Sequence, residues 1–271
     1  MNTIKTGQLR LYLLFIWILI SLFTHAQESK RDSLEHLLEG KLADTTRIQI
    51  LLETAKITIG RDSIRADSLV QSAKRVSRHI KQIVDKVHAF EQIGSYYVRT
   101  SAYDSALTYY KKTLDIDKKQ GNIARLARHH SNIGNVFFYK GEYNQTLYHF
   151  LQRLSYCEQL DDSTCISAAS NNLGNALINL GRYQDAIDYT LRSLKIDEAL
   201  EYEYGILSSK MSLGNINYYL KNYDKAIEYF SEIVATCEAL GNEQLTMTYA
   251  YNNLGSIFYQ QKKFKKAAEF Y

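Results

Sequence analysis

Residues 171–190 read NNLGNALINLGRYQDAIDYT and contain positions that recur along the whole chain. A glycine column comes first, and its members recur at a nearly constant interval: Gly94, Gly134, Gly174, Gly214 and Gly255. Nine positions after each glycine stands an aromatic residue: Tyr103, Tyr143, Tyr183, Tyr223 and Phe264. Three positions later stands a small residue: Ala106, Thr146, Ala186, Ala226 and Ala267. A fixed period of this kind predicts a stack of repeated units, each burying its apolar face against its neighbours.

Each repeat predicts two amphipathic helices. In the stretch quoted above, Leu173 and Leu177 fall on one face of a first helix, Gly181 and Arg182 interrupt the pattern, and Tyr183 opens a second apolar run. Two helices joined by a tight turn form an antiparallel hairpin. A glycine inside a helix costs about 1 kcal/mol relative to alanine, so a recurring one needs a packing reason. We therefore expect the glycine column to lie where the two helices of a hairpin approach most closely, opposite the small column. We expect the aromatic column to wedge between one hairpin and the next.

These columns resemble the tetratricopeptide-repeat (TPR) family, whose signature is an aliphatic-Gly pair, an aromatic residue, an alanine and a further aromatic residue. The further aromatic column here is Tyr110, Phe150, Thr190, Phe230 and Tyr271. The resemblance covers residues 88–271 and implies an all-α solenoid of antiparallel hairpins that form a right-handed superhelix.

Two departures from the family pattern concern length. The period is about 40 residues rather than the usual ~34 residues. The chain also contains no proline, whereas ordinary members often end the second helix with one. We expect the second helix to run on here because nothing terminates it. The matching positions are Lys118, Glu158, Glu198 and Glu238. This longer unit resembles the variant found in kinesin light chains and in bacterial peptide-sensing TPR regulators.

The N-terminal segment 1–26 predicts a secretory signal peptide. Lys5 and Arg10 precede an apolar run from Leu11 to Phe23, and small residues lead to a cleavage site after Ala26. The run is shorter than the ~20 apolar residues that span a bilayer, so cleavage is favoured over an uncleaved anchor. We therefore expect an extracytoplasmic protein, periplasmic or secreted.

The rest of the chain divides into two predicted parts. Residues 27–87 are expected to form N-terminal helices that include a degenerate first repeat, with residues 62–82 as its second helix. Residues 88–271 are expected to form the array, with four full repeats from about 88, 128, 168 and 208 and an incomplete one from about 249. Because the sequence stops inside a second helix, we expect either a fragment of a longer protein or a truncated gene product.

In the TPR family the first helices line a concave groove, and the resemblance places a neutral, amide-rich set of residues there. The predicted groove residues are Arg128, Asn132, Asn135, Tyr139, Asn171, Asn172, Asn175, Asn179, Asn215, Tyr219, Asn252 and Asn253. An asparagine amide both donates and accepts hydrogen bonds, so a ladder of them suits an extended peptide backbone. The alternative, which we weigh equally, is that these asparagines solvate a polar face or bond to adjacent helices. The carboxylate clamp of co-chaperone TPRs is not expected, because only Arg99 and Arg128 are available for it.

Composition excludes several classes of function. The formal charge of +4 falls to about +2 once the leader is removed, which gives no support for nucleic-acid binding. No catalytic or phosphate-binding motif is present, and we expect neither an enzyme nor a cofactor. His129 and His130 are adjacent on a helix and point in different directions, so no metal site is expected. For Cys157 and Cys165 we favour buried thiols, with a disulfide as the alternative.

The sequence therefore predicts an extracytoplasmic scaffold that binds a protein or peptide segment in its groove. The alternative is the sensory input region of a membrane-bound signalling protein, such as a sensor histidine kinase or related regulator, truncated before its transmembrane and output parts. Only such a missing C-terminal segment would bring the protein to a membrane.

Overall fold

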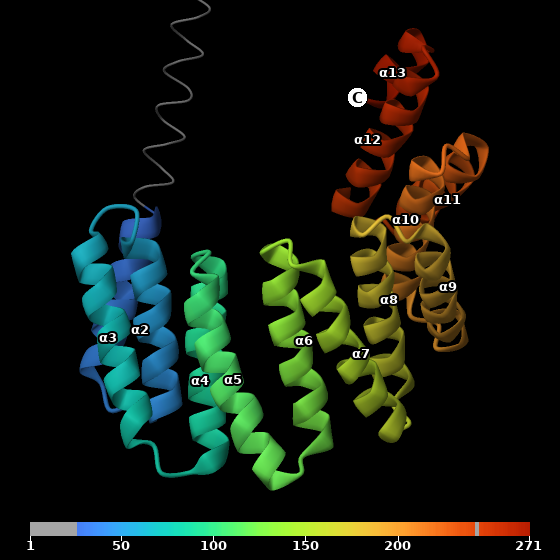
Figure 1. Cartoon of the computed structure of the whole chain (residues 1–271). Helices are drawn as coiled ribbons and strands as arrows, with labels where there is room; N and C mark the ends of the chain where they lie inside the picture. The colour runs from blue at the N-terminus through green and yellow to red at the C-terminus, as the bar shows by residue number, and fades with distance from the viewer. Residues whose placement is uncertain (1–25, 242–243) are drawn as a thin grey trace, which may run out of the picture. The chain divides into compact units, whose positions relative to one another are not determined.

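The computed structural model describes residues 26–241 and 244–271, and the predicted signal peptide lies almost wholly outside this part. The described residues form helices joined by short turns, and they contain no strand (Figure 1). A helical stretch at residues 26–39 comes first. It is followed by α2 (Asp44–Thr58), α3 (Ser63–His79), α4 (Ile83–Arg99), α5 (Tyr103–Gln120), α6 (Ile123–Tyr139), α7 (Tyr143–Gln159), α8 (Ser163–Asn179), α9 (Tyr183–Ala199), α10 (Glu203–Tyr219), α11 (Tyr223–Leu240), α12 (Gln244–Gln260) and α13 (Phe264–Phe270).

The chain divides into two compact units, Met1–Ile116 and Asp117–Tyr271. In the first unit α2 and α3 form a hairpin against which α4 packs. In the second unit α6 pairs with α7, α8 with α9, α10 with α11 and α12 with α13, and each hairpin packs on the next. The predicted all-α solenoid of antiparallel hairpins is therefore confirmed. None of the described helices is long and apolar enough to cross a membrane.

The turns recur at half the interval of the repeat. After each helix from α4 to α12, one residue adopts a left-handed backbone conformation; these are Ser101, Gly121, Gly141, Asp161, Gly181, Glu201, Lys221, Gly241 and Lys262. Such a residue closes the last turn of a helix and reverses the chain. Two side chains then cap the start of the next helix, because the side chain of Asn122 accepts from the Arg125 amide and that of Asp162 from the Cys165 amide.

The extra length of the repeat is shared between its helices. Helices α7 and α9 end directly after Glu158 and Glu198, at Gln159 and Ala199, so they do run past the position of the usual proline. However, α6 and α8 are as long as α7 and α9. The added length is therefore not confined to the second helix, since each repeat here consists of two halves of nearly equal length.

The glycine column lies at a close approach within each hairpin, as predicted, but the side chain it faces belongs to the further aromatic column. A Cβ added to Gly214 would lie 2.6 Å from the ring of Phe230, which is fully buried. Gly94, Gly134 and Gly255 face Tyr110, Phe150 and Tyr271 in the same way. At Gly174 the obstacle is the hydroxyl of Thr190. Because glycine has no side chain, each of these positions leaves room for a side chain of the second helix in the same hairpin.

The small column is buried throughout the array, with Ala106, Thr146, Ala186 and Ala226 fully inaccessible and Ala267 nearly so. At Gly174 the backbone oxygen of Ala186, a member of this column, lies 3.4 Å from an added Cβ. The side chain nearest each glycine belongs to the further aromatic column rather than to the small column.

The aromatic column makes two kinds of contact. Tyr183 stacks on Tyr219 of the next hairpin, with ring centroids 5.8 Å apart, which is the predicted wedge. Three other members pack instead against the end of the first helix in their own hairpin: Tyr143 against Phe138, Tyr223 against Tyr218 and Phe264 against Tyr259. The aromatic column therefore packs at the turn within a hairpin as well as at the junction to the next hairpin.

Candidate functional site

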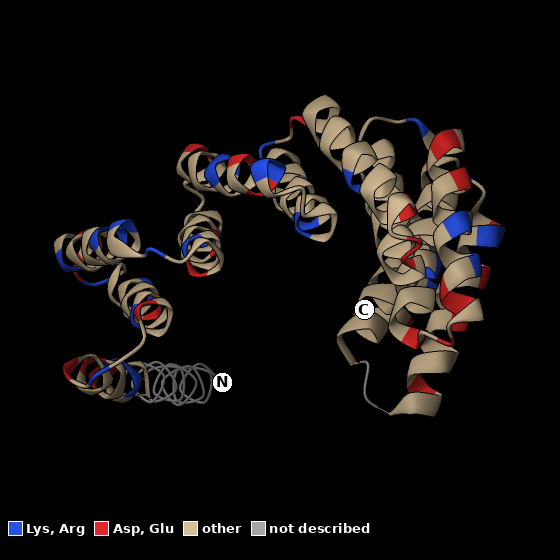
Figure 2. Ribbon diagram, turned by 90° about the horizontal axis from the view of Figure 1, so that it is seen from below, with Lys and Arg blue, Asp and Glu red and all other residues tan. Residues whose placement is uncertain are grey.

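Charge is distributed unequally among the helices of the second unit. Between Ser163 and Asn179 in α8, and between Gln244 and Gln260 in α12, there is no Asp, Glu, Lys or Arg. Helix α9 alone contains six. Figure 2 shows this contrast as long tan stretches beside helices with blue and red segments. Helices α8 and α12 therefore carry a neutral polar face, whereas α6 contains Arg125 and Arg128 and α10 contains Glu203 and Lys210.

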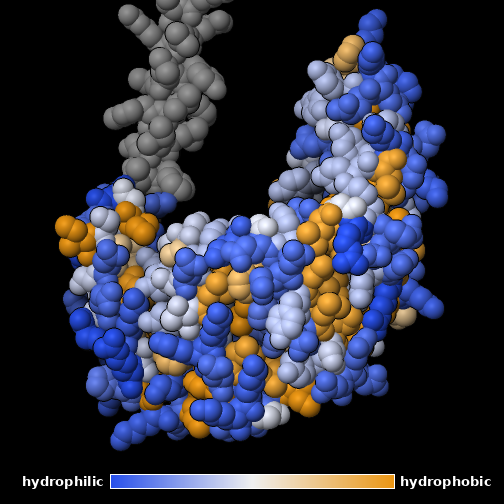
Figure 3. All heavy atoms as spheres, viewed as in Figure 1, coloured by the Kyte–Doolittle hydropathy of each residue, from blue (hydrophilic) through white to orange (hydrophobic). Residues whose placement is uncertain are grey.

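The predicted groove residues all keep contact with solvent. Arg128, Tyr139, Asn179, Tyr219 and Asn252 are exposed, and Asn132, Asn135, Asn171, Asn172, Asn175, Asn215 and Asn253 are half-buried. On the face shown in Figure 3 hydrophilic side chains predominate, and hydrophobic ones gather in separate patches. The set is thus available for contact, although Tyr219 also stacks on Tyr183.

Part of the asparagine set joins consecutive first helices. Between α8 and α10, Asn171 Nδ2 donates to Ser208 Oγ at 2.8 Å, and Ser212 Oγ donates to Asn175 Oδ1 at 3.1 Å. Between α10 and α12, Asn253 Nδ2 donates to Asn215 Oδ1 at 3.3 Å. We call these three bonds the amide ladder. Four predicted groove residues therefore bond to adjacent helices, which was the alternative role considered for them.

A pocket of about 330 Å³ lies beside the ladder, where α8 meets the end of α9 and the start of α10. Three predicted groove residues, Asn171, Asn172 and Asn175, line one side of it. The remaining lining residues are Thr164, Ser167, Ala168, Ser193, Asp197, Tyr202, Tyr204, Gly205 and Ser208. The structure thus brings part of the predicted groove together with residues of α9 and of the turn after it.

The floor of this pocket is a buried polar cluster centred on Asp197, which is only 3% exposed. Ser167 Oγ donates to Asp197 Oδ1 at 2.6 Å, and Ser193 Oγ donates to Asp197 Oδ2 at 3.3 Å. Ser209 Oγ donates in turn to Ser193 Oγ at 3.2 Å. Within the described part of the chain, no Lys, Arg or His forms an ion pair with Asp197. The carboxylate is therefore held by hydroxyl groups alone.

Asp197 occupies a position that recurs at every junction between repeats. We call the residue near the end of a second helix and the residue eight positions later, in the next first helix, a junction pair. The pairs in the second unit are Asp117 with Arg125, Cys157 with Cys165, Asp197 with Gly205, and Cys237 with Leu245. Sequence reasoning missed the pocket because it considered only first helices, although the register of the repeat already shows Asp and Cys alternating in this column.

The first two junction pairs are closed by a bond. Arg125 Nε lies 3.3 Å from Asp117 Oδ1, and His129 Nε2 lies 2.5 Å from Asp117 Oδ2. Cys157 and Cys165 form a disulfide, with their Cα atoms 5.4 Å apart. The favoured interpretation of these cysteines as free thiols was wrong, because the turn brings the two ends of the junction within bonding reach.

The adjacent histidines have different partners. His129 bonds to Asp117, whereas His130 Nδ1 lies 3.1 Å from His149 Nδ1 on α7. Burial, and then the neighbouring His149, lower the pKa of His130 from 6.5 to about 4, so its ring is neutral at pH 7. No group of three or more potential metal ligands occurs among the described residues.

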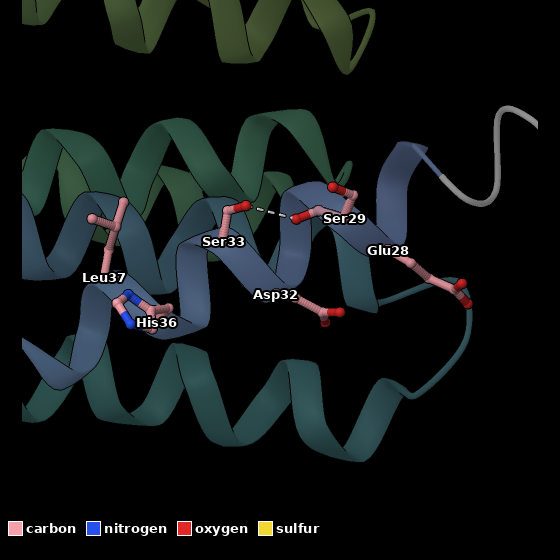
Figure 4. A pocket seen from close by; sticks show the side chains of 6 residues that line it. All are labelled: Glu28, Ser29, Asp32, Ser33, His36 and Leu37. Carbon is pink, nitrogen blue, oxygen red and sulfur yellow. Dashed lines mark hydrogen bonds between the residues drawn. The ribbon is translucent and has the colours of Figure 1, made fainter.

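A second hollow lies in the first unit, at the helical stretch 26–39. Figure 4 shows the side chains that line it, all from this one helix, together with the bond from Ser33 Oγ to the Ser29 carbonyl oxygen. Every lining residue keeps contact with solvent, and none is a buried polar group. This hollow is an open strip of helix surface rather than a built site.

The sequence profile described as tetratricopeptide repeat matches residues 125–199 and 205–271, which is more than half of the chain. The chain belongs to the tetratricopeptide-repeat family. The family pattern resides in the glycine, aromatic and small columns, and TPR proteins in general bind protein partners rather than catalyse reactions. Among curated protein sequences, none is significantly similar to this TPR chain.

Several solved structures share the fold of this TPR protein. Aspartyl phosphate phosphatase F from Bacillus subtilis is 17% identical, with a TM-score of 0.65 over 83% of this chain and 68% of that one. A Rap protein complexed with Competence and Sporulation Factor is 17% identical, with a TM-score of 0.60 over 89% of this chain and 77% of that one. A STAND signal-transduction ATPase with a tetratricopeptide-repeat sensor from Pyrococcus horikoshii is 13% identical, with a TM-score of 0.68 over 90% of this chain and 39% of that one. At these identities the likeness shows the fold alone.

Proposed function

We propose that this TPR protein is a non-catalytic scaffold that binds an extended peptide segment along the amide-rich polar face of α8, α10 and α12, continued by α6. The observation that carries the proposal is the absence of charge from α8 and α12, combined with recurring asparagines at solvent-accessible positions. Asparagine is a mediocre helix former, so its repeated use on helices needs a cause beyond helix stability. The Rap protein complexed with Competence and Sporulation Factor shows that a similar fold holds a partner.

The amide ladder divides the groove residues into two functional groups. Asn171, Asn175 and their partners hold successive first helices in register, and they position the face. Asn132, Asn172 and Asn252 take no part in the ladder, so their amides remain to bond a peptide backbone. Binding and positioning are therefore separable by mutation.

The test is affinity for peptides selected from a random library on the mature chain. We expect the triple variant Asn132→Ala, Asn172→Ala, Asn252→Ala to bind a selected peptide about 10- to 100-fold more weakly, since each lost hydrogen bond is worth ~1 kcal/mol. Its thermal stability should stay close to wild type because the ladder is intact. A matched control replaces three exposed amides of second helices, with Asn144→Ala, Gln145→Ala and Gln184→Ala. Equal affinity of both triple variants would place the binding site elsewhere.

We also propose that the protein works outside the cytoplasm. Two features support this location: the predicted leader before Gln27, and the Cys157–Cys165 disulfide, since disulfides persist mainly in oxidising compartments. A second proposal shares this location and takes the array as the sensory part of a larger membrane-bound signalling protein. The neighbour whose TPR region is described as a sensor supports it.

The intact mass of the native protein in membrane and periplasmic fractions distinguishes these proposals. A soluble species that begins at Gln27 and ends near Tyr271 would support the free scaffold. A much heavier, membrane-bound species would support the sensory role. A native protein that retains Met1 and occurs only in the cytoplasm would contradict the extracytoplasmic location.

A further inference from the structure

The pocket between α8, α9 and α10 differs from the equivalent places at the two preceding junctions in having no internal closure. At the first junction a guanidinium, that of Arg125, lies against the Asp117 carboxylate. At the second the cysteines are joined covalently. At the third, Gly205 stands where Arg125 stands two repeats earlier, and Ser209 stands where His129 stands. Both nitrogen-bearing partners of the buried carboxylate are therefore replaced by small residues.

The pocket lies beside Gly205, at the position where the first junction has the side chain of Arg125. Asp197, Gly205 and Ser208 all line it, and a Cβ on Gly205 would lie only 2.5 Å from Asp197 Cγ. A buried carboxylate is costly unless hydrogen bonds and a positive charge compensate it. Ser167 and Ser193 supply hydrogen bonds, and the start of α10 supplies a partial positive charge. None of these provides the full charge that Arg125 provides to Asp117.

The mouth of the pocket is aromatic. Tyr202 and Tyr204 line it, are 48% and 61% exposed, and have ring centroids 6.2 Å apart. Tyr202 stands at the N-cap of α10, where the two preceding junctions have the capping residues Asn122 and Asp162, and its side chain makes no cap bond. Tyr202 thus places an exposed aromatic ring where the two preceding junctions have a capping side chain. Aromatic faces attract guanidinium groups in particular.

We infer that this pocket binds the guanidinium of an arginine side chain in the peptide held by the neighbouring groove, so that the ligand supplies in trans the group that Arg125 supplies within the chain. The inference rests on the proposed function, because Asn171, Asn172 and Asn175 line both the groove and the pocket. The planar guanidinium would bond to the Asp197 carboxylate at the floor and stack on a tyrosine ring at the mouth. Peptides with arginine at one fixed position are therefore the preferred partners.

The pocket can be tested without any selected peptide. The probe is Nα-acetyl-arginine N-methylamide, compared by NMR titration with the citrulline compound, which has the same shape and no charge. We expect the arginine compound to bind at least ~10-fold more tightly to the mature chain, as a charge-assisted bond requires. The Asp197→Asn variant should bind both compounds equally. Asp188→Asn, which removes an exposed carboxylate from the same helix, should behave like wild type.

A second variant fills the pocket from within. Gly205→Arg introduces the residue that the first junction has at this position, and we expect it to abolish binding of the arginine compound. Because its Cβ must displace the Asp197 carboxylate, we expect the melting temperature to fall. Equal binding of the arginine and citrulline compounds to wild type, or unchanged preference in Asp197→Asn, would overturn the inference. If selected peptides bind the groove but tolerate arginine-to-citrulline exchange at every position, the pocket assignment fails and the groove stands. If no peptide binds but the arginine compound does, the groove fails and the pocket stands.

Discussion

At the scale of single residues, Thr190 is the exception in a column of aromatic rings. It therefore allows a test of whether the glycine column makes room for the side chain of the second helix. Its hydroxyl donates to the Ala186 carbonyl at 2.7 Å and fills the space above Gly174. We expect Gly174→Ala to lower the free energy of unfolding by about 1–2 kcal/mol, because the new methyl group displaces that buried hydroxyl. In a Thr190→Ala background the same change should instead stabilise by up to ~1 kcal/mol, since alanine is the better helix former.

Urea denaturation of the four proteins in this cycle measures the coupling between the two positions. A Gly174→Ala effect of the same sign and size in both backgrounds would mean that the glycine serves a purpose other than making room for the side chain of residue 190.

The buried His130 gives a pH dependence whose direction can be derived. Its pKa of about 4 in the folded protein lies below the usual 6.5, so the unfolded chain binds more protons between these values. Stability contributed by the neutral ring is present above pH 6.5 and is lost as the pH falls towards 4. We expect this residue to lower the free energy of unfolding by about 2 kcal/mol between pH 7 and pH 5.

Urea titrations at both pH values, for wild type and His130→Gln, check this expectation. The variant should be less stable at pH 7 but should lose less stability on acidification. An identical pH dependence in both proteins would show that His130 is not the responsible group.

At the scale of helices, the junction pairs determine how hairpins are joined. The Cys157–Cys165 disulfide closes a short loop between α7 and α8, with a sequence separation of 8. Loop entropy predicts that it stabilises the folded state by about 2–3 kcal/mol. We expect reductant to lower the urea midpoint of wild type and to have no effect on the double variant Cys157→Ser, Cys165→Ser. If reductant leaves wild type unchanged, the two sulfurs are not bonded in the native protein.

The amide ladder gives a prediction of the same kind. Asn171→Ala removes the donor to Ser208 and an acceptor of Ser212, so we expect a loss of about 1–2 kcal/mol in the free energy of unfolding. Asn172→Ala, at the next position of α8, should change stability by less than ~0.5 kcal/mol. Equal effects of the two variants in urea denaturation would argue against a positioning role for the ladder.

Hairpins were predictable from sequence because the apolar and glycine positions repeat with helical spacing. The starts of the first helices were less predictable than the hairpins. These helices begin at Ile123, Ser163 and Glu203, more than one helical turn before the predicted repeat starts. Those first turns carry no clear apolar periodicity. The partner of the glycine column was also not predictable, because spacing identifies a face of a helix but not which side chain of the opposite helix reaches it.

At the scale of the whole molecule, the resemblance to the TPR family, in which the first helices line the groove, led to the predicted groove residues. The pocket was not found that way, since it needs residues from a first helix, a second helix and a turn at once. Asn171, Asp197 and Tyr202 are far apart in the repeat pattern and meet only because α8, α9 and α10 pack together. A register comparison of junction pairs is the sequence signal that points to it.

Photo-crosslinking tests the central claim, that first helices of the second unit hold a peptide, most directly. A peptide selected from a random library would carry a benzophenone side chain at each position in turn, and crosslinked residues of the mature chain would be identified by mass spectrometry. The account predicts crosslinks on α6, α8, α10 and α12, with those nearest the arginine position falling at Tyr202 or Tyr204. Crosslinks confined to the second helices α7, α9 and α11 would contradict it.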